Sequence, residues 1–96
     1  MNVKEQIIYV MRKYAEGEYD TKSFCEALGT LYYFEAGGHR FFHGEEKLLL
    51  DELVAVTERF SPYEEDYRVI PNAYFSEEQV KKKFNEIAAQ LSFVNA

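Results

Sequence analysis

The sequence predicts an all-α domain with the architecture of an antiparallel four-helix bundle. Apolar side chains recur every three or four residues in four segments, which is the spacing of one face of an α-helix. Links between these segments are mostly short, which favours antiparallel neighbours. No segment alternates long enough to predict a strand, and the only candidates are residues 41–42 and 67–70. With 96 residues, 47% of them hydrophobic, the chain is expected to form one domain, 1–96, with a small core.

Capping residues and glycine mark the first two helices. Asn2 and Glu5 form a capping-box pattern, so the first helix is expected to begin at once and to end at Gly17. Asp20 is expected to cap the second helix, over residues 21–35. The residues expected on the inner faces of these helices are Val3, Ile7, Val10, Met11, Tyr14, Phe24, Leu28, Leu31 and Tyr32.

Two residues of the second helix need a separate interpretation. Cys25 is the only cysteine, and its place beside Phe24 predicts a buried, reduced thiol that acts as a small hydrophobic group. A reactive thiol is the less favoured alternative, and the absence of a cysteine pair fits a reducing cytosol. Gly29 destabilises the middle of a helix by about 1 kcal/mol relative to alanine. It either lets a neighbouring helix approach closely or is a weak point.

Residues 36–44 are expected to connect the second and third helices, because Gly37 and Gly38 interrupt the helical pattern. His39 and His43, the only histidines, lie in this connection. At helical spacing they could share a metal, but no cysteine or third histidine is near, so we expect two loop imidazoles. No Lys-Ser or Lys-Thr pair follows the glycines, which argues against a phosphate-binding loop. The sequence therefore predicts neither a metal nor a cofactor.

The third helix is expected over residues 45–60 and the last from Ser76 onward. The third has a wide apolar face, which is typical of a central helix in a bundle. In the last helix Ser76 and Gln79 form a capping-box pattern. The apolar stripes comprise Leu49, Leu50, Leu53, Val54, Val56, Thr57 and Phe60 in the third helix and Val80, Phe84, Ile87, Ala88 and Leu91 in the last.

Residues 61–75 are expected to form a longer connection with one short helical turn. Ser61 as N-cap, Pro62 at the first helical position and Glu64 form a capping-box pattern. Acids in a helical first turn are favoured by the helix dipole. The apolar residues expected to fold back onto the core are Tyr67, Val69 and Ile70.

The charge of the chain is concentrated in residues 45–78. This stretch holds ten acids and three bases, a balance of −7, whereas the remainder holds seven acids and eight bases, a balance of +1. A concentrated negative field attracts a basic partner and speeds its capture. It argues against binding to nucleic-acid phosphates. The lysines at 81–83 are expected to lie on the solvated face of the last helix.

Patterns typical of enzymes and of membrane proteins are missing from the sequence. It contains no nucleophile elbow, no Ser-His-acid order and no paired metal ligands, so we expect no catalytic residues. His39 or His43 acting with a distant carboxylate is the remaining enzymatic alternative. The longest apolar run, Leu48–Leu50, is far too short to span a bilayer, and no signal peptide or lipidation motif is visible. A cytoplasmic, non-enzymatic protein is expected.

Around residues 57–66 the chain resembles the colicin D immunity protein family. The matching residues are Leu53, Ala55, Glu58-Arg59-Phe60, Pro62, Glu65 and Asp66. A helix with the Val80 to Ile87 spacing follows, and a looser match covers 19–28, so the resemblance extends over about two thirds of the chain. Members of this family are small acidic helical proteins that neutralise a tRNA-cleaving bacterial toxin.

The resemblance implies a protein that covers the basic active-site cleft of a cognate nuclease toxin, a tRNase, with an acidic surface. It implies that Glu58 reaches the active centre, that Glu65 and Asp66 bind flanking cations, and that Tyr63 packs at the rim. Carboxylates would then take the place of RNA phosphates in charge-assisted bonds. The residues expected to bind the partner are Asp51, Glu58, Arg59, Tyr63, Glu64, Glu65, Asp66 and Tyr67.

A second class of function fits the same composition. With eight tyrosines and eight phenylalanines, several rings are expected to be partly exposed, as in protein interfaces. The chain is alternatively a helical scaffold or regulatory module that dimerises through these rings. As an immunity protein it is expected to be a monomer or weak dimer when free. That function further requires carboxylates that share a surface and are not neutralised by Arg59, Arg68 and the lysines.

Overall fold

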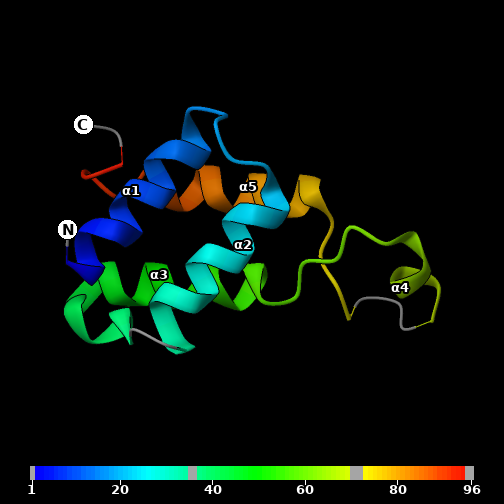
Figure 1. Cartoon of the computed structure of the whole chain (residues 1–96), viewed down its shortest axis with the longest axis horizontal. Helices are drawn as coiled ribbons and strands as arrows, with labels where there is room; N and C mark the ends of the chain where they lie inside the picture. Colours follow the sequence, from blue (N-terminus) through cyan, green and yellow to red (C-terminus); the bar gives the residue numbers. More distant parts are fainter. Residues whose placement is uncertain (1, 35–36, 70–72, 95–96) are drawn as a thin grey trace.

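The computed structural model describes residues 2–34, 37–69 and 73–94, and these parts of the chain are helical (Figure 1). The α-helices are α1 (Val3–Ala15), α2 (Thr21–Gly29), α3 (Gly44–Thr57), α4 (Glu64–Val69) and α5 (Glu77–Ala88). A π-helical segment, η1 (Thr30–Phe34), continues α2, and a short 3-10 helix, η2 (Gly38–Phe41), precedes α3. The described parts contain no strand, and Phe60 and Phe75 form an isolated parallel bridge. The all-α prediction is confirmed.

The N-caps predicted for α1, α2 and α5 are confirmed. Each capping side chain accepts a hydrogen bond from the backbone N–H three residues further on, which satisfies a donor that the helix leaves unpaired. The pairs are Asn2–Glu5 at 2.8 Å, Asp20–Ser23 at 2.7 Å and Ser76–Gln79 at 3.2 Å. The last pair is a complete capping box, because the Gln79 side chain also accepts from the Ser76 N–H. Gly17, with a φ of +80°, follows the end of α1.

An aromatic cluster joins α1, α2 and α5. The rings of Tyr14 and Phe24 stack with centroids 4.0 Å apart, and Phe84 meets both edge-on at 4.9 and 5.4 Å. The buried Tyr14 hydroxyl hydrogen-bonds to Thr21 Oγ1 at 2.9 Å, so the ring is buried without an unsatisfied polar group. The predicted apolar stripe of α5 is buried throughout, and α3 adds Leu49, Leu50, Leu53 and Val54 to the same core.

Helices α3 and α5 lie side by side and run in opposite directions (Figure 1). Phe60, after the end of α3, pairs with Phe75, before the start of α5. Further along, Lys83 of α5 lies 3.7 Å from Glu52 of α3. Helix α2 crosses both of these helices obliquely in the same view. In the described parts of the chain, no helix has the length and the apolar character that crossing a membrane requires.

The second helix differs from the regular helix expected over 21–35. Regular α-helix ends at Gly29, and the following segment is π-helical, a form that is rare and often found at functional sites. Close approach of a neighbouring helix does not explain Gly29, because a β-carbon added there would meet no atom within 4 Å. Close packing occurs instead at Gly38, where an added β-carbon would lie 2.6 Å from the Leu31 carbonyl oxygen and 2.9 Å from Val3 Cγ1.

The two strand candidates are wrong. Residue 41 ends the 3-10 helix η2, and Phe42 is a buried linking residue whose ring packs near Phe93. Residues 67–69 belong to α4, and residue 70 lies outside the described parts. Short apolar runs do not distinguish strand from helix.

Residues 61–69, which we call the α4 arm, do not fold onto the core as expected. Figure 1 shows α4 apart from the other helices, at one end of a molecule that measures 39 Å along its long axis and 25 and 23 Å across. Val69 is 77% exposed, so its predicted burial is wrong. The Tyr67 side chain and Ile70 lie outside what the structure describes.

Helix α4 begins two residues later than the predicted start at Pro62. The Ser61 hydroxyl oxygen accepts a hydrogen bond from the Tyr63 N–H at 3.2 Å and donates a short hydrogen bond to Asp66 Oδ2. Ser61 therefore stabilises a turn ahead of the helix. The helix then begins at Glu64.

Two glycine substitutions with opposite expected effects test this packing. Gly38→Ala should lower the free energy of unfolding by about 2 kcal/mol, because the new methyl group overlaps the Leu31 carbonyl and the side chains of Val3 and Ile7. Gly29→Ala should raise it by about 0.5–1 kcal/mol, because alanine restricts the unfolded chain and meets open space. Urea unfolding followed by circular dichroism measures both. A lower free energy of unfolding for Gly29→Ala would contradict the finding that a β-carbon at residue 29 meets no neighbouring atom.

Candidate functional site

A groove lies between α2 and the segment that joins α3 to α4. Its volume is about 740 Å³. The buried residues Cys25, Gly29 and Thr57 form its base, and the exposed residues Glu26 and Glu58 belong to its rim. The two carboxylates come from different helices, α2 and the end of α3. We call this site the α2–α3 groove.

Glu58 occupies a position that the helix itself does not favour. It is the C-cap of α3, and its side chain is exposed. The C-terminal end of a helix carries partial negative charge, so a carboxylate there is electrostatically unfavourable. Helix stability therefore does not explain an acid at this position, whereas it does explain Glu45 and Glu46 in the first turn of the same helix.

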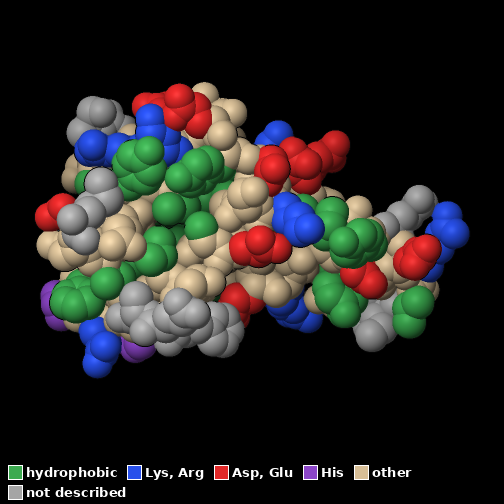
Figure 2. All heavy atoms as spheres, in the orientation of Figure 1, with side chains coloured by type: hydrophobic (Ala, Val, Ile, Leu, Met, Phe, Trp, Pro, Cys, Tyr) green, Lys and Arg blue, Asp and Glu red, His purple; other side chains and the backbone are tan. Residues whose placement is uncertain are grey.

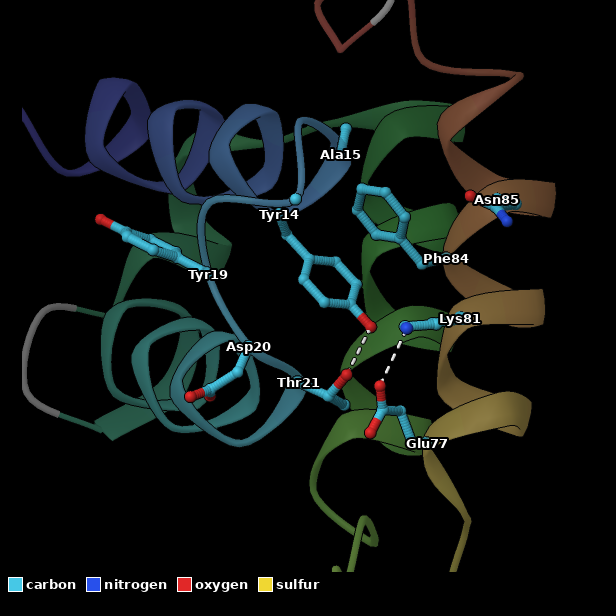
Figure 3. Close-up of a pocket in the computed structure, with 10 residues that line it drawn as sticks. Tyr14, Ala15, Tyr19, Asp20, Thr21, Glu77, Lys81, Phe84 and Asn85 are labelled. Carbon is cyan, nitrogen blue, oxygen red and sulfur yellow. Dashed lines mark hydrogen bonds and ion pairs between the residues drawn. The ribbon is translucent and has the colours of Figure 1, made fainter.

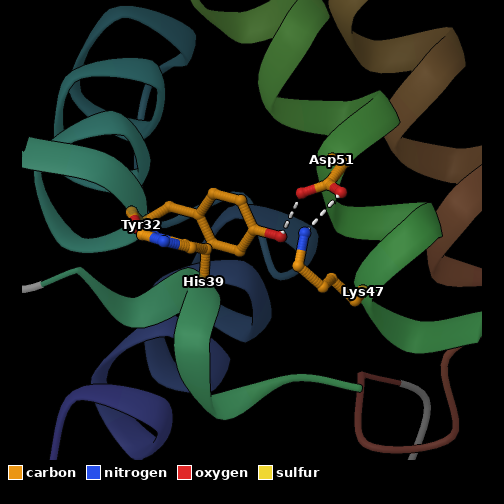
Figure 4. A network of polar contacts seen from close by, with 4 residues as sticks. All are labelled: Tyr32, His39, Lys47 and Asp51. Carbon is orange, nitrogen blue, oxygen red and sulfur yellow. Dashed lines mark hydrogen bonds and ion pairs between the residues drawn. The ribbon is translucent and has the colours of Figure 1, made fainter. Parts of the chain in front are cut away.

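Asp51 is held by partners within the chain (Figure 4). Its Oδ1 accepts a hydrogen bond from the Tyr32 hydroxyl at 2.6 Å, and its Oδ2 lies 2.8 Å from Lys47 Nζ. Burial acts to raise the pKa of Asp51, but the hydrogen bonds from Lys47 and Tyr32 outweigh it, so that the pKa lies below its ordinary value. Burial, and then Asp51, raise the pKa of Tyr32. Direct contact between Asp51 and a partner stays a prediction.

The two histidines differ in their surroundings. His39 lies in η2, its Nδ1 is 2.9 Å from the Tyr32 carbonyl oxygen, and its ring packs against Tyr32 and Tyr33. His43 is exposed and precedes α3 without a side-chain capping bond. Among the residues that the structure describes, no group of three or more His, Cys, Asp or Glu side chains could hold a metal ion.

Tyr33 packs against Tyr32, and their ring centroids are 4.9 Å apart. Burial raises the pKa of Tyr33, and the negative charges of Asp51 and Glu58 raise it further. The side chain is nevertheless partly exposed. Sequence reasoning did not assign a role to Tyr33. The only signal was its membership of the aromatic run 32–34.

The predicted site residues of the α4 arm have different environments. Tyr63 is 60% exposed and lines the α2–α3 groove. Glu65 is exposed, whereas Asp66 is half-buried and accepts the hydrogen bond from Ser61. Residues Glu64 and Tyr67 lie in α4, and their side chains are outside what the structure describes.

Arg59 stabilises the junction at which the α4 arm joins the rest of the chain. Its Nε donates to the Ala73 carbonyl oxygen at 3.0 Å, and its guanidinium lies over the Phe75 ring, 5.8 Å from the centroid. Both contacts join Arg59 to residues 73–75, where the chain leads into α5. Arg59 thus has a structural role, and a role in partner binding stays a prediction.

Lysines neutralise part of the acidic stretch 45–78. Ion pairs in the described structure join Lys47 to Asp51 at 2.8 Å, Lys81 to Glu77 at 2.8 Å and Lys83 to Glu52 at 3.7 Å. Figure 2 shows acidic and basic side chains interspersed where the body meets the α4 arm. The candidate acidic surface is therefore narrower than the stretch itself. Its centre is Glu58, which shares the α2–α3 groove with Glu26.

A second groove is a weaker candidate (Figure 3). It has a volume of about 420 Å³ and lies between α5 and the link from α1 to α2. Its polar groups are largely paired with one another, since Tyr14 bonds to Thr21 and Lys81 bonds to Glu77. No side chain in these pairs is left to direct a ligand.

Comparisons of the chain with protein-family models, with characterised proteins and with solved structures found no match. The function is therefore argued from the α2–α3 groove, the exposed Glu58 carboxylate and the charge of the chain.

The Asp51 network generates a prediction about pH. Because the folded pKa of Asp51 is lowered, its ionised form stabilises the fold above the unfolded pKa of about 4, and this contribution is lost as the pH falls through the folded pKa. Asp51→Asn should be less stable than the wild type by about 1 kcal/mol at pH 7, and the difference should shrink towards about pH 2. Urea unfolding across this range measures it, with Glu86→Gln as the exposed control. A difference that stays constant with pH would contradict the lowered pKa.

Proposed function

We propose that this chain is an immunity protein of the colicin D immunity type. It binds a cognate bacterial nuclease toxin, a tRNase, and inhibits it by covering the basic active-site cleft with an acidic surface. It acts in the cytoplasm, without catalysis and without a cofactor. The observation that carries the proposal is the exposed carboxylate of Glu58, at a helix end that disfavours an acid and beside an open groove.

The surroundings of Glu58 suit an interface that competes with RNA. A nuclease that holds RNA must direct Lys and Arg side chains at phosphates, and a carboxylate can accept the same charge-assisted hydrogen bonds. The exposed Tyr63 lines the same groove as Glu58, and tyrosine is enriched in protein interfaces. Burial of this ring would slow dissociation, while the net charge of −6 would speed association.

The role of the α4 arm follows from its position. Glu65 is exposed on α4 and is proposed to bind a flanking cation of the nuclease. Asp66 is already bonded to Ser61, so we assign it to maintaining the turn that precedes α4. Asp51 is bonded to Tyr32 and Lys47, so we assign it to stabilising the contact between η1 and α3.

For the architecture, we infer that α1, α2, α3 and α5 form an antiparallel four-helix bundle with α4 as an appendage. The opposite directions of α3 and α5 and the ring cluster of α1, α2 and α5 support this arrangement. The oblique crossing of α2 makes it less regular than an idealised bundle.

A pair of charge reversals tests the proposed function. Glu58→Lys should weaken binding to a colicin D-type tRNase domain by at least about 100-fold, because it places a cation in a cationic cleft. Glu86→Lys changes the net charge equally at an exposed position of α5 and should stay within about threefold of the wild type. Isothermal titration calorimetry measures binding. Survival of cells that express the nuclease domain measures protection.

Two results would contradict this function. Equal loss of binding in Glu58→Lys and Glu86→Lys would mean that only net charge matters. Full protection by the double variant Glu58→Lys, Glu65→Lys would show that another surface binds the toxin. The scaffold alternative predicts a tight homodimer in light scattering, with Tyr33 and Tyr63 buried between the copies.

A further inference from the structure

We propose that the α2–α3 groove binds one arginine side chain of the basic partner, with the guanidinium held between Glu26 and Glu58. The inference rests on the proposed function, because it takes the partner to be a basic protein. Beyond the proposed function, it names the chemical group of the partner that enters the groove and the residues of this chain that bind that group.

The base of the groove suits the apolar part of a long side chain. Cys25, Gly29 and Thr57 are buried there, and burial raises the pKa of Cys25 to about 12, so its thiol is uncharged at neutral pH. The volume of about 740 Å³ lies in the range of about 300–1,000 Å³ that is typical of ligand sites. Aliphatic carbons that lie on this base would leave a charged end group at the rim.

The charges at the rim select a cation. Glu26 approaches from α2 and Glu58 from the end of α3, so that two carboxylates line one groove. Lys22 also lines it and supplies one positive charge, which leaves a net negative rim. An apolar occupant would cover these carboxylates without replacing their hydration, which is unfavourable. Charge complementarity therefore commits the groove to a basic side chain.

Aromatic residues at the rim favour arginine over lysine. Phe60 and Tyr63 both line the groove, and Tyr63 is largely exposed in the free chain. A planar guanidinium stacks on aromatic rings and donates to two carboxylates at once, whereas an ammonium group does so less well. Contact with the partner would also cover the exposed Tyr63 ring.

Gly29 is explained if the groove must stay open. Its φ is not positive, and no neighbouring atom would meet a β-carbon, so neither backbone conformation nor packing requires glycine at this position. Glycine there destabilises α2 relative to alanine. A larger side chain would project into the groove and occupy the space that we assign to the arginine.

The first experiment is an NMR titration of the free chain with Nα-acetyl-arginine amide. We expect saturable shifts, at millimolar concentration, of the amide signals of residues 25–30 and 57–63. Nα-acetyl-norleucine amide should cause none, and the lysine analogue should bind about threefold more weakly than arginine. Shifts spread over the whole acidic surface, or equal shifts with norleucine, would overturn the proposal.

Four variants have different expected effects on arginine binding. Gly29→Leu should abolish arginine binding by filling the groove, whereas Gly29→Ala should change it by less than about twofold. Glu26→Gln should weaken binding by about threefold to tenfold, and Lys22→Gln should strengthen it by about twofold. An unfolded variant would not bind arginine more tightly, so the stronger binding expected for Lys22→Gln cannot result from unfolding. Leucine is a good helix former, so Gly29→Leu is expected to keep α2 helical. Unchanged binding in Gly29→Leu would overturn the proposal.

The same variants separate this inference from the proposed function. If the tRNase domain binds the wild type and binds Gly29→Leu at least about 100-fold more weakly, both are supported. If Gly29→Leu binds the tRNase domain with wild-type affinity, the groove proposal fails and the proposed function stands. If the wild type binds arginine amide but not the tRNase domain, the groove is a guanidinium site and the proposed function fails.

Discussion

The backbone bridge between Phe60 and Phe75 is the constraint on which the candidate site depends. The Ser61 N–H donates to the Phe75 carbonyl oxygen at 3.1 Å, and the Phe75 N–H donates to the Arg59 carbonyl oxygen at 2.7 Å. These bonds join the exit of α3 to the entry of α5, and the Arg59 side chain reinforces the junction through Ala73 and the Phe75 ring. The chain therefore leaves for α4 and comes back from it at the same place, where residues 59–61 are bonded to Phe75.

The bridge also fixes the geometry of Glu58. Without it, the segment after Thr57 would be free to turn away from α2, and the groove would lose one wall. With it, Phe60 and Tyr63 stay opposite Glu26, although more than thirty residues of sequence separate them from it. The surface is thus assembled before any partner arrives, which lowers the entropy lost on binding.

Local chemistry determined what could be predicted from the sequence. The caps at Asn2, Asp20 and Ser76 depend on a residue three positions away, and the apolar stripe of α5 depends on its own periodicity, so both were predicted correctly. The π-helical segment after Gly29 and the 3-10 helix at Gly38 were not predicted. The fit of Gly38 against Val3 and Ile7 is a tertiary contact that no local pattern reveals.

The candidate site likewise combines residues that local sequence features predicted with residues that only the tertiary fold brings together. The sequence predicted Glu58 and Tyr63 as partner-binding residues, and both line one side of the groove. It missed Glu26 on the opposite wall and Gly29 in the base, because only the fold brings α2 to the end of α3. Val69 was expected to be buried because it is apolar, but a helix of six residues has too little periodicity to show which side faces the core.

The separation of the α4 arm from the core has a consequence for evolutionary change. Substitutions at exposed positions such as Tyr63, Glu65 and Val69 remove few packed contacts, so most of them alter the free energy of unfolding by less than about 0.5 kcal/mol. If the proposed function holds, the arm can accumulate mutations that change which toxin is recognised while the helical body persists unchanged. Selection for a new target would then act first on the appendage and only later on the scaffold.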